Sequence, residues 1–160
     1  MAQFSLESNG LLEDTAIYFN GKQIEGVKEI FLNLDEDGTF DSVIQYEGSD
    51  GVLHSKEIFN DYLANIKTRP PAYSEEDTDS LQLLTIESNG DIGQTYVFRN
   101  DEEQFGIVSL FIHIKGTSTV DRPSLKSMFS AKKNIPDIPE FKVEITYRED
   151  NDDLTTENVF

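Results

Sequence analysis

Residues 6–34 read LESNGLLEDTAIYFNGKQIEGVKEIFLNL, and residues 86–114 read IESNGDIGQTYVFRNDEEQFGIVSLFIHI. The second stretch aligns with the first at a constant offset of eighty residues and without a gap. Residues 7–10 (ESNG) recur unchanged as residues 87–90, and apolar positions of one stretch mostly align with apolar positions of the other. Self-similarity of this kind predicts an internal duplication, so we expect two pseudo-repeats.

Both stretches alternate apolar and polar residues and are divided by turn sequences such as Asn9-Gly10 and Asn20-Gly21. Alternation with a period of two is typical of half-buried strands, and Asn-Gly favours tight turns. The sequence therefore predicts a mainly β, antiparallel fold with about four strands in each pseudo-repeat. The expected strands are 3–7, 15–19, 22–24, 27–34 and 40–46, followed in the second repeat by 81–87, 95–99, 106–115 and 141–147.

Two helices are expected besides these strands. In 55–67 the apolar residues Ile58, Phe59, Leu63 and Ile66 lie at helical spacing, which predicts an amphipathic helix whose stripe, completed by Tyr62, closes the core of the first repeat rather than binding a partner. A short helix is expected at 124–131. The pseudo-repeats would pack as sandwich-like β units. One pseudo-symmetric sandwich and two similar units in close contact are both compatible with the pattern, and we favour the second.

The predicted organisation has four parts. Residues 1–69 form the first β repeat with its C-terminal helix, and residues 70–80 form a linker rich in proline and acidic residues. Residues 81–148 form the second β repeat, in which an insertion at 116–140 replaces a four-residue turn. Residues 149–160 form an acidic tail, expected to be loosely ordered unless Val159 and Phe160 dock.

The bulk composition restricts the partners. The chain has 160 residues, no cysteine and a net charge of −18. Such a charge disfavours nucleic acid and anionic membranes, so we expect neither as a direct partner. An acidic surface can simply confer solubility, meet a basic protein or imitate nucleic acid. No signal peptide and no apolar run of membrane-spanning length is visible in the sequence.

The insertion carries the opposite charge. Residues 115–133, here called the basic arm, hold five basic residues against one acid. Long loops on rigid scaffolds often carry function. The basic arm either packs on the acidic surface of its own chain or grips a neighbouring subunit, which could be a second copy. The candidate partner-binding residues are Lys115, Arg122, Lys126, Met128, Phe129, Lys132 and Lys133.

Residues with catalytic or metal-binding chemistry are sparse. The two histidines, His54 and His113, lack neighbours at metal-ligand spacing and are expected to be structural or surface residues. Asn33, Asp35 and Asp37 match the start of a calcium loop, but its twelfth position is Ile44 instead of Glu, and hairpin geometry explains the same residues. We therefore expect no enzyme activity and no cofactor.

The first repeat contains, in order, Ser8-Asn9-Gly10, Thr15-Ala16-Ile17, Asn20-Gly21, Ile24 and Val27. This pattern resembles a short β module of small proteins encoded by tailed bacteriophages and prophages. The resemblance covers about thirty residues and implies a non-enzymatic, all-β protein, either a virion component or an accessory factor. It implies no functional residues.

Two functions are expected from these observations. The first is a phage virion structural or assembly protein that contacts protein neighbours, including copies of itself, through sheet edges and the basic arm. The alternative is an acidic, nucleic-acid-mimicking inhibitor of a host nucleic-acid-binding or defence protein. The expected location is the virion or the cytoplasm of an infected cell.

Overall fold

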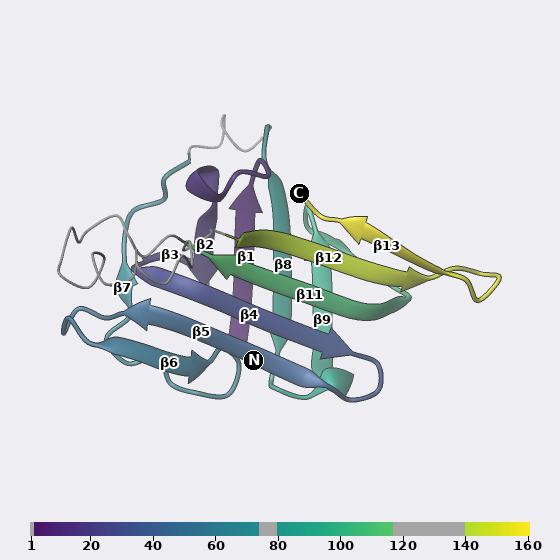
Figure 1. Cartoon of the computed structure of the whole chain (residues 1–160), viewed down its shortest axis with the longest axis horizontal. Coiled ribbons are helices and arrows are strands. Elements are labelled where there is room, and N and C mark those ends of the chain that lie inside the picture. Colours follow the sequence, from purple (N-terminus) through teal and green to yellow (C-terminus); the bar gives the residue numbers. More distant parts are fainter. Residues whose placement is uncertain (1, 74–79, 117–139) are drawn as a thin grey trace, which may run out of the picture.

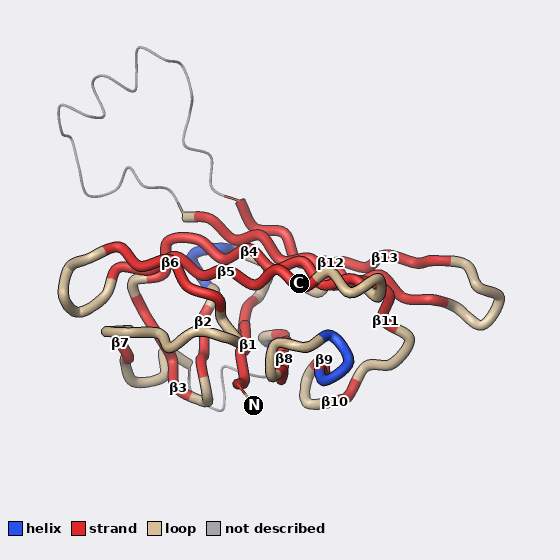
Figure 2. The backbone as a smooth tube through the Cα atoms, turned by 90° about the horizontal axis from the view of Figure 1, so that it is seen from below, coloured by secondary structure: helices blue, strands red, loops and turns tan. Residues whose placement is uncertain are grey.

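The computed structural model describes residues 2–73, 80–116 and 140–160, which form two antiparallel β-sheets packed face to face (Figures 1 and 2). In Figure 1 the long strands β4, β5, β11 and β12 run across the strands β1, β8 and β9 of the layer behind them. Figure 2 shows the two layers edge-on. Within the described ranges no helix has the length and apolar character needed to cross a membrane.

Each sheet is named here by its number of strands. The seven-stranded sheet has the order β10 (Glu102–Glu103), β9 (Thr95–Arg99), β8 (Gln82–Ser88), β1 (Ala2–Ser8), β2 (Ala16–Phe19), β3 (Lys22–Glu25) and β7 (Lys67–Thr68). The six-stranded sheet has the order β13 (Leu154–Asn158), β12 (Glu140–Arg148), β11 (Ile107–Lys115), β4 (Val27–Asp35), β5 (Phe40–Glu47) and β6 (Leu53–Glu57). Two short 3-10 turns, Leu12–Asp14 and Ile92–Gln94, connect β1 to β2 and β8 to β9.

Strands from both halves of the chain meet at the centre of both sheets. In the seven-stranded sheet β1 pairs with β8, with Ser5 opposite Thr85. In the six-stranded sheet β4 pairs with β11, with Leu32 opposite Ile112. The side chains that alternate inward from these strands are buried, as the period of two requires, and one continuous apolar core contains residues of both halves.

The expected strands are confirmed, each within two residues of its predicted ends. The strongest example is β4, in which Ile30, Leu32 and Leu34 are buried while their neighbours are half-buried or exposed. The short pairing at 22–24 is also present, as β3 next to β2. The fold class is therefore mainly antiparallel β, as predicted.

The amphipathic helix predicted at 55–67 is wrong. Strand β6 covers residues 53–57 and pairs with β5, and turns connect it to the two-residue strand β7. Most apolar residues of the stripe are still buried, since Ile58 and Leu63 are 1% and 4% exposed, but Ile66 is half-buried and Tyr62 is 85% exposed. Asp61 explains part of the difference, because its carboxylate accepts a hydrogen bond from the Glu57 N–H at 2.8 Å and so competes with helical hydrogen bonding.

The C-terminal segment differs from the loosely ordered tail that was expected. Residues 154–158 form β13, which pairs with β12 over its whole length. Val159 is buried at 4% exposure, and the ring of Phe160 lies 5.9 Å from that of Phe141. The docking of Val159 and Phe160 that the sequence allowed is therefore present. The helix predicted at 124–131 lies outside the described residues.

Candidate functional site

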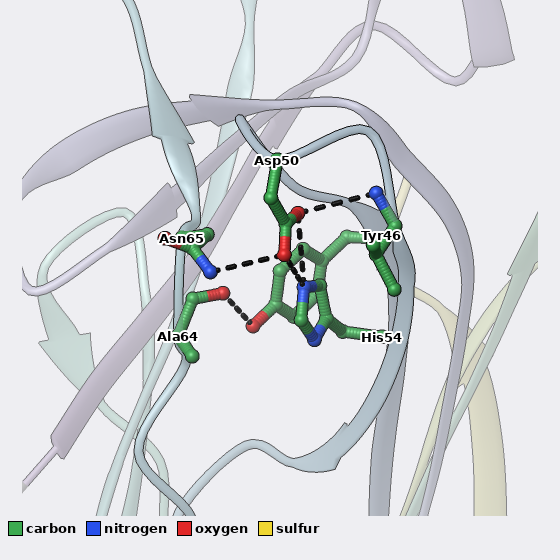
Figure 3. Close-up of polar contacts among 6 residues, drawn as sticks. Tyr46, Asp50, His54, Ala64 and Asn65 are labelled. Carbon is green, nitrogen blue, oxygen red and sulfur yellow. Dashed lines mark hydrogen bonds and ion pairs between the residues drawn. The ribbon is translucent and has the colours of Figure 1, made fainter.

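A cluster of polar side chains lies where the β5–β6 hairpin meets the loop after β6. Tyr46 is fully buried, and its hydroxyl donates a hydrogen bond to the carbonyl of Ala64 at 2.7 Å (Figure 3). The ring of His54 stacks on Tyr46, with 5.2 Å between ring centroids and 24° between planes. Asp50, from the hairpin turn, and Asn65 complete the cluster. We call these five residues the clasp.

Asp50 is the centre of the clasp. Its carboxylate contacts His54 Nε2 at 3.1 Å and accepts hydrogen bonds from the Asn65 side-chain amide at 3.1 Å and the Val52 N–H at 3.2 Å (Figure 3). The Ser49 N–H also donates to the carbonyl of Asn65, at 2.8 Å. Every one of these contacts either closes the hairpin turn or ties it to residues 64–65, so the clasp fixes the loop that replaces the expected helix.

The electrostatics of the clasp result from these contacts. Desolvation acts to raise the pKa of Asp50, but hydrogen bonds from the Val52 N–H and from His54 outweigh it, so the pKa of this carboxyl is lowered. Burial, with the nearby Asp50 charge, raises the pKa of the Tyr46 phenol. Both shifts favour a neutral tyrosine beside an ionised aspartate at neutral pH, which suits a structural hydrogen-bond network.

A second histidine joins three strands on the outer face of the six-stranded sheet. His113 on β11 contacts Glu29 on β4 through Nε2 at 2.7 Å and Glu140 on β12 through Nδ1. Beside it, Phe31 and Phe111 form an edge-to-face pair with centroids 5.8 Å apart. The group is therefore a half-buried cross-strand packing site.

On the outer face of the seven-stranded sheet, polar residues anchor the segment after β7. The Ala72 N–H donates to the side chain of Gln23 at 2.7 Å, and Tyr73 donates to the carbonyl of Asp14. Next to them, burial together with the 3.0 Å hydrogen bond to Glu7 raises the pKa of Tyr18 to about 12. The polar groups named here thus form their hydrogen bonds within the chain itself.

The residues that matched a calcium loop serve the β4–β5 turn. Asp35 accepts a hydrogen bond from the Asp37 N–H at 3.1 Å, and Asp37 accepts from the hydroxyl and N–H of Thr39. These Thr39 hydrogen bonds lower the pKa of Asp37. Asn33 belongs to β4, opposite Asp41. Within residues 2–73, 80–116 and 140–160, no group of three His, Cys, Asp or Glu side chains could hold a metal ion.

Among the predicted partner-binding residues, only Lys115 belongs to the described chain. It is the last residue of β11 and lies opposite Glu29 and Glu140 in the register. The others, Arg122, Lys126, Met128, Phe129, Lys132 and Lys133, lie outside the described residues. The basic arm begins at the end of β11, and residues 117–139 connect β11 to its neighbour β12, which pairs with it up to Lys115 and Glu140.

The strands that form the two edges of the six-stranded sheet, β6 and β13, were not among the expected strands. β6 and β13 are each five residues long, and Leu53 and Leu154 on them are 55% and 58% exposed. A sequence signal for both strands exists. Residues 40–59 align with residues 141–160 at an offset of 101 without a gap, and Leu53 and Phe59 recur as Leu154 and Phe160.

No family model, no curated protein and no solved structure matches the chain.

Proposed function

We propose that the chain is a non-enzymatic assembly or protein-binding protein, a phage-encoded virion component that contacts neighbours through sheet edges and the basic arm. The observation that carries the proposal is the six-stranded sheet, which ends on both sides in five-residue strands with exposed leucines. Exposed strand edges offer backbone N–H and C=O groups to another chain, and natural proteins usually block them.

We also infer that the fold arose by duplication. The centre of each sheet supports this inference, because positions eighty residues apart in the sequence pair with each other there. Ser5 lies opposite Thr85 with 2.9 Å between their hydroxyl oxygens, and Leu32 lies opposite Ile112. This is the register that a pseudo-twofold axis through each sheet would produce.

The duplicated turns provide independent support. Asn20 and Asn100 both have positive φ, of 51° and 52°, and the side chain of each accepts a hydrogen bond at 2.9 Å from a backbone N–H of the neighbouring strand, β1 or β8. Ser8 bonds the hydroxyl of Thr15 at 2.8 Å, and Ser88 bonds that of Thr95 at 2.7 Å. The recurring residues thus make recurring hydrogen bonds, which supports a common origin of the two halves.

Deletion of residues 117–139 tests the role of the basic arm. Lys115 and Glu140 pair at the adjacent ends of β11 and β12, so a short Gly-Ser turn would close the gap as the four-residue turn closes β4–β5. We expect the variant to keep the far-ultraviolet circular dichroism of a β protein and to lose capture of its partner from phage lysates. A variant that unfolds would place the arm in the core, and a folded variant with full capture would remove the arm from the proposal.

The alternative, an acidic inhibitor of a nucleic-acid-binding protein, is favoured by one observation. The β4–β5 turn and the β12–β13 turn lie at the same end of the six-stranded sheet, where Arg148 contacts Glu36 at 2.7 Å. Both turns are acidic; the exposed carboxylates there are Glu36, Asp37, Asp41, Glu149, Asp150, Asp152 and Asp153. Replacing the last four by lysine should abolish capture of a basic partner, and unchanged capture would leave the assembly role as the better proposal.

A further inference from the structure

Strand β13 leaves one row of backbone groups directed away from its sheet. On its inner side, the Val159 N–H donates to the Val143 carbonyl at 3.0 Å, and the Glu149 N–H donates to the Asp153 carbonyl at 2.8 Å. Backbone groups alternate sides along an antiparallel strand. The groups of Leu154, Thr156 and Asn158 therefore point outward, and no hydrogen bond reaches them from the described part of the chain.

The opposite edge of the same sheet is blocked by its own chain at Glu57, although not along its whole length. By the same alternation, the backbone of Glu57 on β6 points outward, because Ile58 donates inward to Ser42 at 2.8 Å. The Glu57 N–H donates to the Asp61 carboxylate at 2.8 Å, and its carbonyl accepts from the Asp61 N–H at 3.0 Å. Lys56 adds a charge within β6, which is a common protection of edge strands.

The composition of β13 lacks such protection. The strand reads LTTEN, with two β-branched threonines and neither lysine nor proline, and all five residues are exposed. Its only charged side chain, Glu157, is already paired with Arg99 on the seven-stranded sheet at 2.9 Å. The β13 edge is therefore both unblocked and nearly uncharged, in a protein that is otherwise strongly acidic.

We propose that β13 pairs antiparallel with β13 of a second copy, around a twofold axis at Thr156, so that two six-stranded sheets join into one. The inference rests on the proposed assembly role and names the partner and the edge. Thr156 would face Thr156 of the second copy, and Leu154 would face Asn158 of the second copy. Each outward residue then exchanges two backbone hydrogen bonds. Glu157 faces Thr155 of the second copy, so the five-residue ladder contains no like-charge pair.

The size and charge of this contact set its strength. A five-residue edge buries less than the roughly 1,000 Å² of a stable interface, so the dimer is concentration-dependent. Each copy carries a net charge of −18, and the copies repel one another at long range. Salt screens that repulsion over about 10 Å at 0.1 M. We therefore expect association to strengthen as the salt concentration rises, which is the opposite of a contact made by ion pairs.

A cysteine cross-link tests the register directly, because the chain has no cysteine of its own. Directly opposed, hydrogen-bonded residues in an antiparallel pair have Cα atoms about 5.5 Å apart, within the range of a disulfide. Thr156→Cys should form a covalent dimer under mild oxidation at least about tenfold faster than Ser55→Cys, the matched position on β6. Equal rates in the two variants would overturn the proposal.

Proline substitution tests the hydrogen bonds without a cross-link. Proline is tolerated on an edge strand where its missing N–H would face solvent, so Thr156→Pro should fold and associate at least about tenfold more weakly in sedimentation equilibrium. Ser55→Pro is the matched control and should associate like the parent chain. Folding of both variants is checked by thermal unfolding.

Three outcomes separate this inference from the proposed function. Loss of the dimer in Thr156→Pro alone supports it, and loss in neither or in both variants overturns it. A parent chain that is monomeric at every protein and salt concentration, yet still captures a partner through the basic arm, would overturn the β13 dimer while the assembly role stands. Failure of partner capture, with the β13 dimer intact, would overturn only the role of the arm.

Discussion

Tyr46 and Tyr147 hold corresponding places before the turns of two hairpins of equal length, and they are secured in different ways. In both hairpins the residue after the tyrosine donates its N–H at 2.8 Å to a glycine carbonyl, Gly26 in one and Gly106 in the other. Tyr46 is fully buried and bonds the loop after β6, whereas Tyr147 is half-buried and bonds Gln104 at 3.0 Å. The same strand geometry therefore supports an internal clasp in one hairpin and an open edge in the other.

The two hairpins differ in the segment of chain that comes after each of them. After β6 the chain continues through residues 58–66, which bring Asp61 to the β6 edge and Ala64 to Tyr46. After β13 it runs through Val159 to Phe160, whose backbone lies beside Gly10. Asp61, in the loop after β6, thus blocks one outward-facing residue of that strand, and no residue of the described chain does the same for β13.

The largest expected effect separates the two tyrosines. Tyr46→Ala removes a fully buried ring, its stacking on His54 and its hydrogen bond to Ala64. We expect a loss of about 3–5 kcal/mol in the free energy of unfolding, measured by urea denaturation. Tyr147→Ala is the control and should cost about 1–2 kcal/mol, because its ring is half-buried. Equal losses would mean that the clasp contributes nothing beyond hairpin packing.

The second expected effect is a gain in stability. Ser42 on β5 is 3% exposed, and its hydroxyl has no hydrogen-bond partner among the described residues, while the corresponding position on β12 is Val143, also buried. A buried hydroxyl without a partner costs about 1–3 kcal/mol. Ser42→Val should therefore raise the free energy of unfolding by about 1 kcal/mol, observed as a higher urea midpoint with an unchanged slope. The reverse change, Val143→Ser, should lower it, and a stabilising Val143→Ser would contradict the explanation.

The strands and their faces were predictable from the sequence because alternation and Asn-Gly turns are local signals. The clasp was not, since Asp50 and Asn65 meet only after β6 has paired with β5. The apolar spacing of 55–67 correctly identified Ile58 and Leu63 as core residues but predicted the wrong backbone. Apolar spacing alone does not show that an aspartate will accept a hydrogen bond from the backbone of the preceding strand. Here that hydrogen bond and the long-range pairing of β6 with β5 outweighed the local helical preference.

The β13 edge was missed for a different reason. Residues 149–160 are polar and acidic, which is typical of a solvated tail, and their alternation is hidden because all residues of β13 are exposed. Only comparison with residues 40–59 at the new offset of 101 reveals Leu154 and Phe160 as counterparts of Leu53 and Phe59. The offset changes from eighty to 101 because the connection between β11 and β12 is longer than the one between β4 and β5.

A smaller effect is expected where the second hairpin reaches the other sheet. Glu157 contacts Arg99 at 2.9 Å, and the two side chains are 49% and 25% exposed. Exposed ion pairs are worth about 0.2–1 kcal/mol and are screened by salt. Glu157→Gln should lower the free energy of unfolding by about 0.5 kcal/mol at low salt and by less at high salt. Lys56→Gln, at the corresponding position of β6, should change it less, and a salt-independent loss would point to packing instead of charge.

The smallest expected effect is a change in the pH dependence of the melting temperature at acid pH. It concerns Asp50, whose counterpart in the second turn is Asn151. Both side chains accept a hydrogen bond at 3.2 Å from the N–H two residues later, but only Asp50 also contacts a histidine. Its folded-state pKa is lowered, so its contribution to stability is present above the unfolded-state value of about 4 and is lost as the pH falls through the folded-state value. Asp50→Asn should therefore flatten the decline in melting temperature below about pH 4 while leaving the second hairpin unaffected.

Thermal unfolding across the acid range up to neutral pH measures this, with Asp153→Asn as a control from the exposed second turn. A decline as steep as that of the parent chain would show that the clasp does not depend on the charge of Asp50.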